Sequence, residues 1–309
     1  MDGVSLALRS GEALGLVGES GCGKTTLART AVRLIPATSG RILFRGEDIT
    51  YLNRRRLGTV RRHLQMVFQD PSSSLNPRMT AEQAVAQPLR IARSYDRSGR
   101  ARVEELFERV GLDRSHLGRF PHELSGGQRQ RVGIARALAP GPDVIVLDEP
   151  VSSLDVSIRA QIVNLLAALR DDLGVAYLFI AHDLSIVRHL CDRVAVMYLG
   201  KIVEIGERRD IFTSPTHPYT QSLLSAVPVP DPAQRGRRAR IVLAGEMPDA
   251  ARPPSGCRFR TRCWKAEARC VESEPELVDR FDHGHPSACH FADPDPSSGR
   301  PTTSLCVRE

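Results

Sequence analysis

The amino-acid sequence predicts an α/β fold in which a parallel or mixed sheet is interrupted by a block of helices. Three observations lead to this class. Strand and helix patterns alternate over residues 1–70, and the alternation resumes after residue 140. Residues 76–139 between these stretches carry helical patterns only. After residue 227 the periodic apolar residues give way to a stretch rich in proline and arginine.

The first stretch begins with a short apolar run that ends in a glycine and predicts a strand at 13–18. A helix at 24–35 follows, and Pro36 stops it because proline cannot continue a helix. Two more apolar runs predict strands at 41–44 and 65–68. In the helical block, apolar residues recur at helical spacing over 78–91, 100–110 and 126–138, and we expect Pro88 to kink the first of these helices.

The second stretch has the clearest periodicity. An apolar strand at 144–147 precedes a long amphipathic helix at 156–173, whose apolar face is formed by Ile158, Ile162, Leu165, Leu166 and Leu169. The alternation continues with strands at 175–180 and 194–197 and a helix at 184–190. These patterns predict a core from residues 1–75 and 140–227, a helical subdomain at 76–139 and a C-terminal extension at 228–309. The extension opens with a linker at 228–240 and closes in a polar tail, which we expect to be disordered.

Composition excludes several classes of protein. The chain has 309 residues, of which 41% are hydrophobic, as in soluble globular proteins. No apolar run approaches the roughly 18 residues of a membrane span, and the N-terminus carries no export signal. The formal charge is +7, but the basic residues are spread along the chain and aromatic residues make up only 5%. We therefore expect no nucleic-acid partner.

Residues 18–25, Gly-Glu-Ser-Gly-Cys-Gly-Lys-Thr, match the phosphate-binding pattern G-x-x-x-x-G-K-[ST]. Backbone N–H groups of such a turn cradle phosphate oxygens, and a side chain at Gly21 or Gly23 would block that approach. Lys24 reaches the β- and γ-phosphates, and the Thr25 hydroxyl binds Mg²⁺. The following helix presents its positive end to the phosphates. The expected nucleotide contacts are Gly18, Glu19, Ser20, Gly21, Cys22, Gly23, Lys24, Thr25 and Thr26.

A second element of the same chemistry is Val-Ile-Val-Leu-Asp-Glu at 144–149, an apolar strand that ends in two carboxylates. Asp148 at the strand end is expected to hold Mg²⁺ through water. Glu149 is expected to face the attacking water as general base or to orient it. Alone, a strand that ends in Asp-Glu is a weak signal, and its value comes from the phosphate-binding loop.

Between these elements lies Leu-Ser-Gly-Gly-Gln at 124–128. Read from the residues, Ser125 caps a helix whose N-terminus is opened by two glycines, which makes a second anion site. With this motif the chain resembles the ATPases of ABC transporters, whose signature is LSGGQ. The resemblance implies a RecA-like core and a head-to-tail dimer in which Ser125, Gly126, Gly127 and Gln128 serve the ATP of the partner subunit.

Other residues fit the same family by position. Gln69 matches the Q-loop glutamine, which senses Mg²⁺ and the transmembrane partner, so the resemblance implies Mg²⁺ contacts from Thr25, Gln69 and Asp148. Asp155 matches the D-loop. His182, after the apolar strand, matches the switch histidine that contacts the γ-phosphate; read alone, it would be a strand-end histidine. Catalysis is thus assigned to Glu149, His182 and Gln69, with ATP and Mg²⁺ as cofactors.

The chain is most similar to the ATPases of dipeptide and oligopeptide importers. The shared segments include EPVSSLDVSIRAQIVNLL and HPYTQSLLSAVP. The resemblance implies an ATPase at the cytoplasmic face of the membrane. Its partners would be a second, different ATPase subunit, two permeases that residues 70–80 help to dock, and an extracellular substrate-binding protein. Alternatives are a degenerate or regulatory nucleotide-binding subunit, an importer ATPase for nickel or other small solutes, and a soluble ABC ATPase.

Four of the seven cysteines lie close together, with the spacing C-x5-C-x6-C-x18-C at Cys257, Cys263, Cys270 and Cys289. Without an export signal, metal is a better expectation than disulfides. Zinc modules space their cysteines more closely, and four thiolates also suit an iron–sulfur cluster. The resemblance implies a structural [4Fe–4S] cluster. Zinc, a disulfide and unligated thiols stay open, with His283, His285 and His290 as alternate ligands.

The beginning of the chain departs from the family pattern. The resemblance implies an edge strand, and an aromatic residue that stacks on adenine, well upstream of the lysine. No aromatic residue precedes Phe44 here. Because such stacking is worth about 1–3 kcal/mol, we expect ATP to bind about ten- to hundredfold more weakly unless the natural start lies upstream. A missing edge strand would also expose apolar surface.

Overall fold

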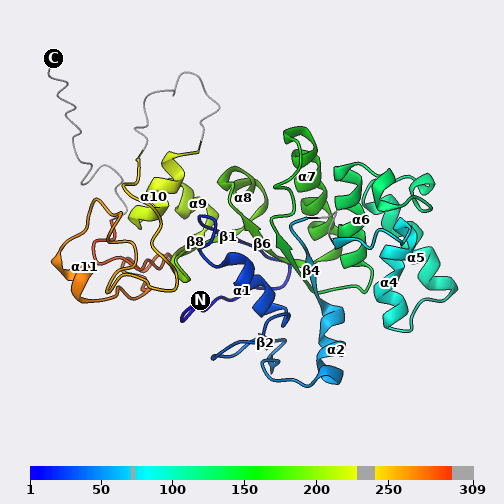
Figure 1. Ribbon diagram of the computed structural model, residues 1–309, viewed down its shortest axis with the longest axis horizontal. Helices are drawn as coiled ribbons and strands as arrows, with labels where there is room; N and C mark the ends of the chain where they lie inside the picture. The colour runs from blue at the N-terminus through cyan, green and yellow to red at the C-terminus, as the bar shows by residue number, and fades with distance from the viewer. Residues whose placement is uncertain (71–73, 228–240, 294–309) are drawn as a thin grey trace, which may run out of the picture.

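The computed structural model describes residues 1–70, 74–227 and 241–293 (Figure 1). Its centre is a six-stranded sheet in the order β4-β5-β6-β1-β7-β8. The strands are β1 (Ala13–Val17), β4 (Leu64–Val67), β5 (Val144–Asp148), β6 (Ala176–Ala181), β7 (Arg193–Tyr198) and β8 (Lys201–Glu207). The pairs that join β4, β5, β6, β1 and β7 are all parallel, and only β8 runs antiparallel to its neighbour β7. The mixed α/β class is therefore confirmed.

Helices pack against both faces of the sheet and gather at one end of the molecule. They are α1 (Lys24–Ala31), α2 (Arg54–His63), α4 (Ala81–Ile91), α5 (Arg97–Arg109), α6 (Gly126–Leu138), α7 (Val156–Leu173), α8 (Leu184–Leu190), α9 (Arg208–Thr213), α10 (Pro218–Ser225) and α11 (Ala268–Glu272), with two 3-10 turns, η1 (Arg114–His116) and η2 (Pro121–Glu123). Figure 1 shows α4, α5 and α6 at one end and α10 and α11 at the other. The predicted linker at 228–240 and most of the predicted tail lie outside the described residues.

Strand burial follows from position in the sheet. Every residue of β1 and β6 is buried, because helices cover both faces of these inner strands. The apolar side chains divide into two clusters, one on each face of the sheet. Val4, Leu6 and Leu8 alternate along the chain before β1 and pack against the second cluster. Apolar residues ahead of β1 therefore cover part of that face.

Several predicted boundaries are wrong by a few residues, and α1 shows why. This helix ends at Ala31 and not at Pro36, because Arg33 adopts a left-handed backbone with φ of 56°. Leu34 N–H donates to the carbonyl of Arg29 and Arg33 N–H donates to that of Thr30, a pairing that closes a helix end. The predicted strand at 41–44 shortens to β2 (Leu43–Phe44), which pairs with β3 (Glu47–Asp48) in a separate small sheet.

Among the elements that were not predicted, α2 and β8 border the core sheet. The helix α2 follows an Asn53 cap and buries only Leu57 and Val60, which gives it a weak apolar pattern. The strand β8 returns from β7 through a two-residue turn at Leu199 and Gly200, both with positive φ. A turn of this kind matches the twist of a hairpin, so it makes the last pair of the sheet antiparallel.

The C-terminal segment 241–293 is joined to the edge strand β8. Ile205 N–H donates to the carbonyl of Pro286 at 3.0 Å, and Ala288 N–H donates to that of Val203 at 2.8 Å. His285 Nε2 lies 2.8 Å from a carboxylate oxygen of Glu204, a β8 residue with no exposed surface. The segment thus covers a sheet edge that would otherwise present unpaired backbone groups.

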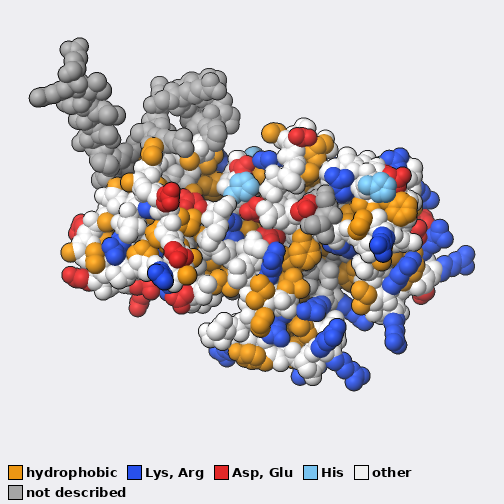
Figure 2. Space-filling model, viewed as in Figure 1, with side chains coloured by type: hydrophobic (Ala, Val, Ile, Leu, Met, Phe, Trp, Pro, Cys, Tyr) orange, Lys and Arg blue, Asp and Glu red, His pale blue; other side chains and the backbone are white. Residues whose placement is uncertain are grey.

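Charge is distributed unevenly over the surface. Figure 2 shows Lys and Arg side chains gathered over the end formed by α4 and α5 and along α2, while Asp and Glu gather over the C-terminal segment. Among the described residues, no helix is both long and apolar enough to cross a membrane.

Candidate active site

The predicted catalytic residues lie at or just after the carboxyl ends of four strands of the sheet. Because β1, β4, β5 and β6 run parallel, their carboxyl ends meet at the same edge. The phosphate-binding loop follows β1, Gln69 follows β4, and His182 follows β6. Asp148 ends β5, and Glu149 comes next. The structure therefore brings these predicted residues together.

The loop after β1 is held by contacts that only glycine permits. A Cβ on Gly18, whose φ is 156°, would lie 2.2 Å from the carbonyl oxygen of Met197. Gly21 and Gly23 also have positive φ values, of 81° and 109°. The Lys24 ammonium is buried beneath the loop and donates to the carbonyl oxygens of Gly18 and Glu19 at 2.7 and 2.9 Å. The Lys24 side chain is thus hydrogen-bonded to the backbone of the loop at its first two residues.

The predicted Mg²⁺ ligands Thr25 and Asp148 lie in contact. The Thr25 hydroxyl donates to a carboxylate oxygen of Asp148 at 3.1 Å. Burial raises the pKa of Asp148, and the hydrogen bond from Thr25 works against that rise. A hydroxyl and a carboxylate are the oxygen donors that Mg²⁺ prefers, so this residue pair fits the ion.

Glu149 contacts two other predicted catalytic residues, Gln69 and His182. Its backbone is left-handed, with φ of 46°, a conformation that is rare outside glycine and clusters at functional sites. One carboxylate oxygen accepts a hydrogen bond from Gln69 Nε2 at 2.9 Å and lies 3.4 Å from His182 Nδ1. The Glu149 side chain is only 13% exposed, whereas that of His182 is 51% exposed. Three predicted catalytic residues therefore meet at one carboxylate.

The signature residues lie elsewhere, at the start of α6. Ser125 caps that helix: its hydroxyl accepts from Gln128 N–H, and the Gln128 side chain accepts from Ser125 N–H. The capping prediction is confirmed. Gly127 lies against α7, where a Cβ would come within 2.6 Å of a methyl group of Ile158. Asp155 begins α7 without a side-chain capping bond. Figure 1 shows α6 well apart from α1, so the structure does not join the signature to the loop of the same chain.

The four cysteines of the extension lie near one another. Cys257 N–H donates to the carbonyl of Cys270 at 2.8 Å. Burial raises the pKa of Cys263 to about 12 and that of Cys289 to about 11, and neighbouring thiols of the group add to both shifts.

No metal centre is evident in this segment. Across the described residues, no three His, Cys, Asp or Glu side chains are arranged to hold a metal ion. Two of the alternate histidines are engaged in other contacts, since His285 pairs with Glu204 and His290 contacts Ser273. The prediction of an iron–sulfur or zinc centre is therefore not supported.

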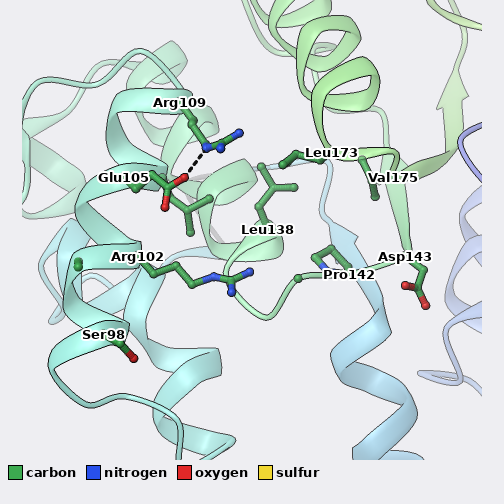
Figure 3. Close-up of a pocket in the computed structure, with 12 residues that line it drawn as sticks. Ser98, Arg102, Glu105, Arg109, Leu138, Pro142, Asp143, Leu173 and Val175 are labelled. Atoms are coloured by element: carbon green, nitrogen blue, oxygen red, sulfur yellow. Dashed lines mark hydrogen bonds and ion pairs between the residues drawn. The ribbon is translucent and has the colours of Figure 1, made fainter.

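A cavity of about 700 Å³ lies outside the predicted site, between α5 and the core (Figure 3). Arg109 donates to Glu105 at 2.8 Å on its own helix and also pairs with Asp172 of α7. Figure 3 shows Arg102 and Asp143 at the rim, on opposite elements. The cavity marks the junction between the helices at this end and the core, and it contains no predicted catalytic residue.

Sequence reasoning missed two residues beside the loop. The Tyr219 hydroxyl accepts a hydrogen bond from Glu19 N–H at 2.8 Å, and the Arg262 guanidinium binds both carboxylate oxygens of Glu19 at 2.8 and 3.2 Å. More than 190 residues separate each pair, so no local pattern could reveal them. The segment HPYTQSLLSAVP, which carries the resemblance to the importer ATPases, contains Tyr219 but does not indicate a contact with the loop.

Two protein-family models and several curated proteins match this chain. A family model described as ABC transporter matches residues 1–152, and one described as Oligopeptide/dipeptide transporter, C-terminal region matches residues 203–270. The oligopeptide transport ATP-binding protein AppF of Bacillus subtilis is 52% identical over 293 residues, which are 94% of this chain and 89% of AppF. The chain belongs to the ABC transporter ATP-binding proteins. OppF of Salmonella typhimurium, another oligopeptide transport ATP-binding protein, is 48% identical over 95% of this chain and 88% of its own length.

Solved structures agree with this assignment. The ABC ATPase described here matches cbiO1 of Clostridium perfringens, part of an ABC transporter complex, with a TM-score of 0.63 and 32% identity over 68% of this chain and 82% of that one. It also matches the ATP-binding cassette MJ0796, solved as a dimer after hydrolysis with ADP and Pi. That match has a TM-score of 0.59 and 29% identity over 66% of this chain and 88% of the other. The predicted family, fold class and ATPase activity are confirmed.

Proposed function

We propose that this chain is the ATP-hydrolysing subunit of an importer for dipeptides and oligopeptides. The observation that carries the proposal is the meeting of Gln69, Glu149 and His182 beside the Thr25–Asp148 pair at one sheet edge. This arrangement supports hydrolysis by attack of water on the γ-phosphate. The peptide cargo is supported by the match of residues 203–270 and by the names of the relatives.

In this mechanism the loop 18–26 holds the phosphates through backbone N–H groups, and Lys24 leaves the carbonyls of Gly18 and Glu19 to bind them. Mg²⁺ held near Thr25, Asp148 and Gln69 neutralises phosphate charge when bound. Glu149 accepts a proton from the attacking water, and its carboxylate is oriented by Gln69 and His182. Each residue thus acts from a position fixed by the end of a different strand.

A second subunit completes the site. We assign Ser125, Gly126, Gly127 and Gln128 to the ATP of the partner, together with Asp155 at the start of α7. Their separation from the loop of their own chain supports a head-to-tail dimer, and the capped N-terminus of α6 supplies a positive dipole end. Closure would then exclude water from two sites at once.

The further partners follow from the same proposal. They are a second ATPase subunit of different sequence, two membrane permeases and an extracellular substrate-binding protein, with no nucleic acid. The chain would lie at the cytoplasmic face of the membrane. Its parts would be a core of residues 1–75 and 140–227, a helical subdomain at 76–139 that docks the permeases, and an extension at 228–309.

The proposal also assigns a structural [4Fe–4S] cluster to Cys257, Cys263, Cys270 and Cys289. Four thiols suit iron–sulfur chemistry. The four cysteines lie near one another, and Cys257 N–H donates to the carbonyl of Cys270 at 2.8 Å. Iron and acid-labile sulfide measured after anaerobic purification test this assignment. We expect about four of each per chain, and stoichiometric zinc, or no metal at all, would contradict it.

Reconstitution in vesicles with the two permeases and a second ATPase subunit tests the transport function. We expect peptides delivered by the binding protein to stimulate ATP turnover. Stimulation by nickel complexes but not by peptides would assign a different cargo. Unchanged turnover in Glu149→Gln would instead identify this chain as a regulatory subunit whose partner carries the activity.

A further inference from the structure

The phosphate-binding loop is held by residues from the C-terminal part of the chain. Glu19, the second residue of the loop, donates its backbone N–H to the Tyr219 hydroxyl of α10 at 2.8 Å. Its carboxylate receives both Nη1 and Nη2 of Arg262, at 2.8 and 3.2 Å. Its carbonyl accepts from Lys24 at 2.9 Å. One residue therefore links the phosphate-binding lysine to two distant segments.

The two side chains that contact Glu19, Tyr219 and Arg262, are buried. The Tyr219 side chain has no exposed surface, and its ring packs 4.7 Å from that of Tyr198 and 5.4 Å from that of Phe259. The Arg262 side chain is 9% exposed. Burial by itself would lower the pKa of Arg262, but the paired Glu19 carboxylate raises it, so the guanidinium stays charged. Paired bonds of this kind fix direction as well as distance.

We infer that Tyr219 and Arg262 are positioning residues for ATP binding, which act through Glu19 to fix the entry of the phosphate-binding loop. Gly18 is confined on the other side by the carbonyl of Met197. The backbone N–H groups that follow Glu19 are those that bind phosphate, so their direction depends on where this peptide is held. The C-terminal extension thereby contributes to nucleotide affinity without touching the nucleotide.

The inference rests on the proposed role of loop 18–26, and the test separates the two. Calorimetry of the full chain with ATP and Mg²⁺ gives both the Kd and the number of binding sites. We expect Arg262→Gln to raise the Kd about tenfold and Tyr219→Phe, which keeps the ring, to raise it about fivefold. The number of sites per chain should stay constant, because a variant that merely misfolds loses sites and leaves the Kd of the remainder unchanged.

Two further comparisons sharpen the result. Arg260→Gln is the matched control, because Arg260 lies two positions away and its side chain bonds to Ser255 of its own segment. Its Kd should change less than twofold. In a Glu19→Gln background, the effect of Arg262→Gln should also fall below about twofold, since the arginine acts through that carboxylate.

Three outcomes would overturn a claim. An equal effect of Arg262→Gln in both backgrounds would show that the arginine does not act through Glu19. Unchanged Kd values in Arg262→Gln and Tyr219→Phe, beside lost binding in Lys24→Ala, would refute the positioning role alone. Unchanged binding in Lys24→Ala would instead refute the proposed role of the loop.

Discussion

The side-chain amide of Gln69 donates to the Glu149 carboxylate at 2.9 Å, across 80 residues of sequence. This bond joins the end of β4 to the end of β5 and holds the carboxylate beside His182. Glu149→Gln keeps the size of the side chain but removes its basicity. We expect ATP turnover to fall by a factor of about 100 or more, because a general base contributes about 10²–10⁴ to the rate.

Measurement of ATP turnover and ATP affinity on the same preparation checks this prediction. Affinity should stay within about twofold of that of the unmodified chain, since the phosphate contacts are unaltered. Asp172→Asn, a change to an exposed carboxylate on α7, is the control and should leave turnover unchanged. Turnover in Glu149→Gln equal to that of the control would rule out the base role.

His182 allows activity to be separated from stability. Its side chain is 51% exposed, so His182→Ala should change the free energy of unfolding by less than about 0.5 kcal/mol. Turnover should fall about 100-fold, because the alanine no longer contacts the Glu149 carboxylate that we propose as the base. Thermal unfolding and a phosphate-release assay check the two quantities. A large drop in melting temperature with modest loss of turnover would indicate a structural role.

Gly127→Ala should destabilise the chain through crowding. The added Cβ would lie 2.6 Å from a methyl group of Ile158, and overpacking of this kind costs about 1–3 kcal/mol. Gly126→Ala is a matched control, since its Cβ would lie at an ordinary 3.4 Å from Leu154. Denaturant unfolding of both variants checks the difference. Ile158→Ala in the same chain should recover part of the loss, and no recovery would contradict crowding as the cause.

His217 should make stability depend on pH. Burial lowers its pKa from 6.5 to about 4 in the folded chain, and its Nδ1 accepts a hydrogen bond from Tyr219 N–H. The unfolded chain therefore binds more protons between pH 6.5 and about 4, so stability falls as pH falls through this window and is fully present above it. The lowered pKa of the neighbouring Glu204 acts in the same direction near the acid end.

Unfolding free energies at pH 7 and pH 4 test this dependence. His217→Asn retains a capping acceptor but does not titrate, so it should lose about 3 kcal/mol less than the unmodified chain over the interval. His189→Asn changes an exposed histidine and should follow the unmodified chain. Equal pH profiles in all three proteins would exclude His217 as the source.

The sequence was informative where chemistry is local. The loop around Lys24 and the acidic end of β5 are continuous patterns, and parallel strands then bring them to one edge. The Ser125 cap was also predictable, because its partner Gln128 is three residues away. Roles for Gln69 and His182 came only from resemblance, since a single glutamine or histidine carries no pattern.

Contacts between distant, unpatterned residues could not be predicted. Arg262 is one arginine in a chain rich in them, and nothing near it in sequence indicates a partner 243 positions away. A mixed sheet was among the predictions, but the strand β8 itself was not predicted, and the Leu199–Gly200 turn is the local feature that could have indicated it. The four cysteines do form a local pattern, but their spacing in sequence does not specify what the side chains bind, so the cluster stays a prediction.

The burial of Glu204 has a consequence for synthesis on the ribosome. Its carboxylate accepts bonds from Thr216 and His217 and pairs with His285, 81 positions further along the chain. A nascent chain that has emerged only as far as β8 therefore carries a charge that it has no means of burying, and a buried charge without its partner costs about 3–5 kcal/mol. At about 5–20 residues per second, the last strand waits several seconds for His285. The edge strand β8 is therefore covered only after the C-terminal segment has been synthesised. A chain released early at β8 would keep this edge uncovered and be prone to aggregation.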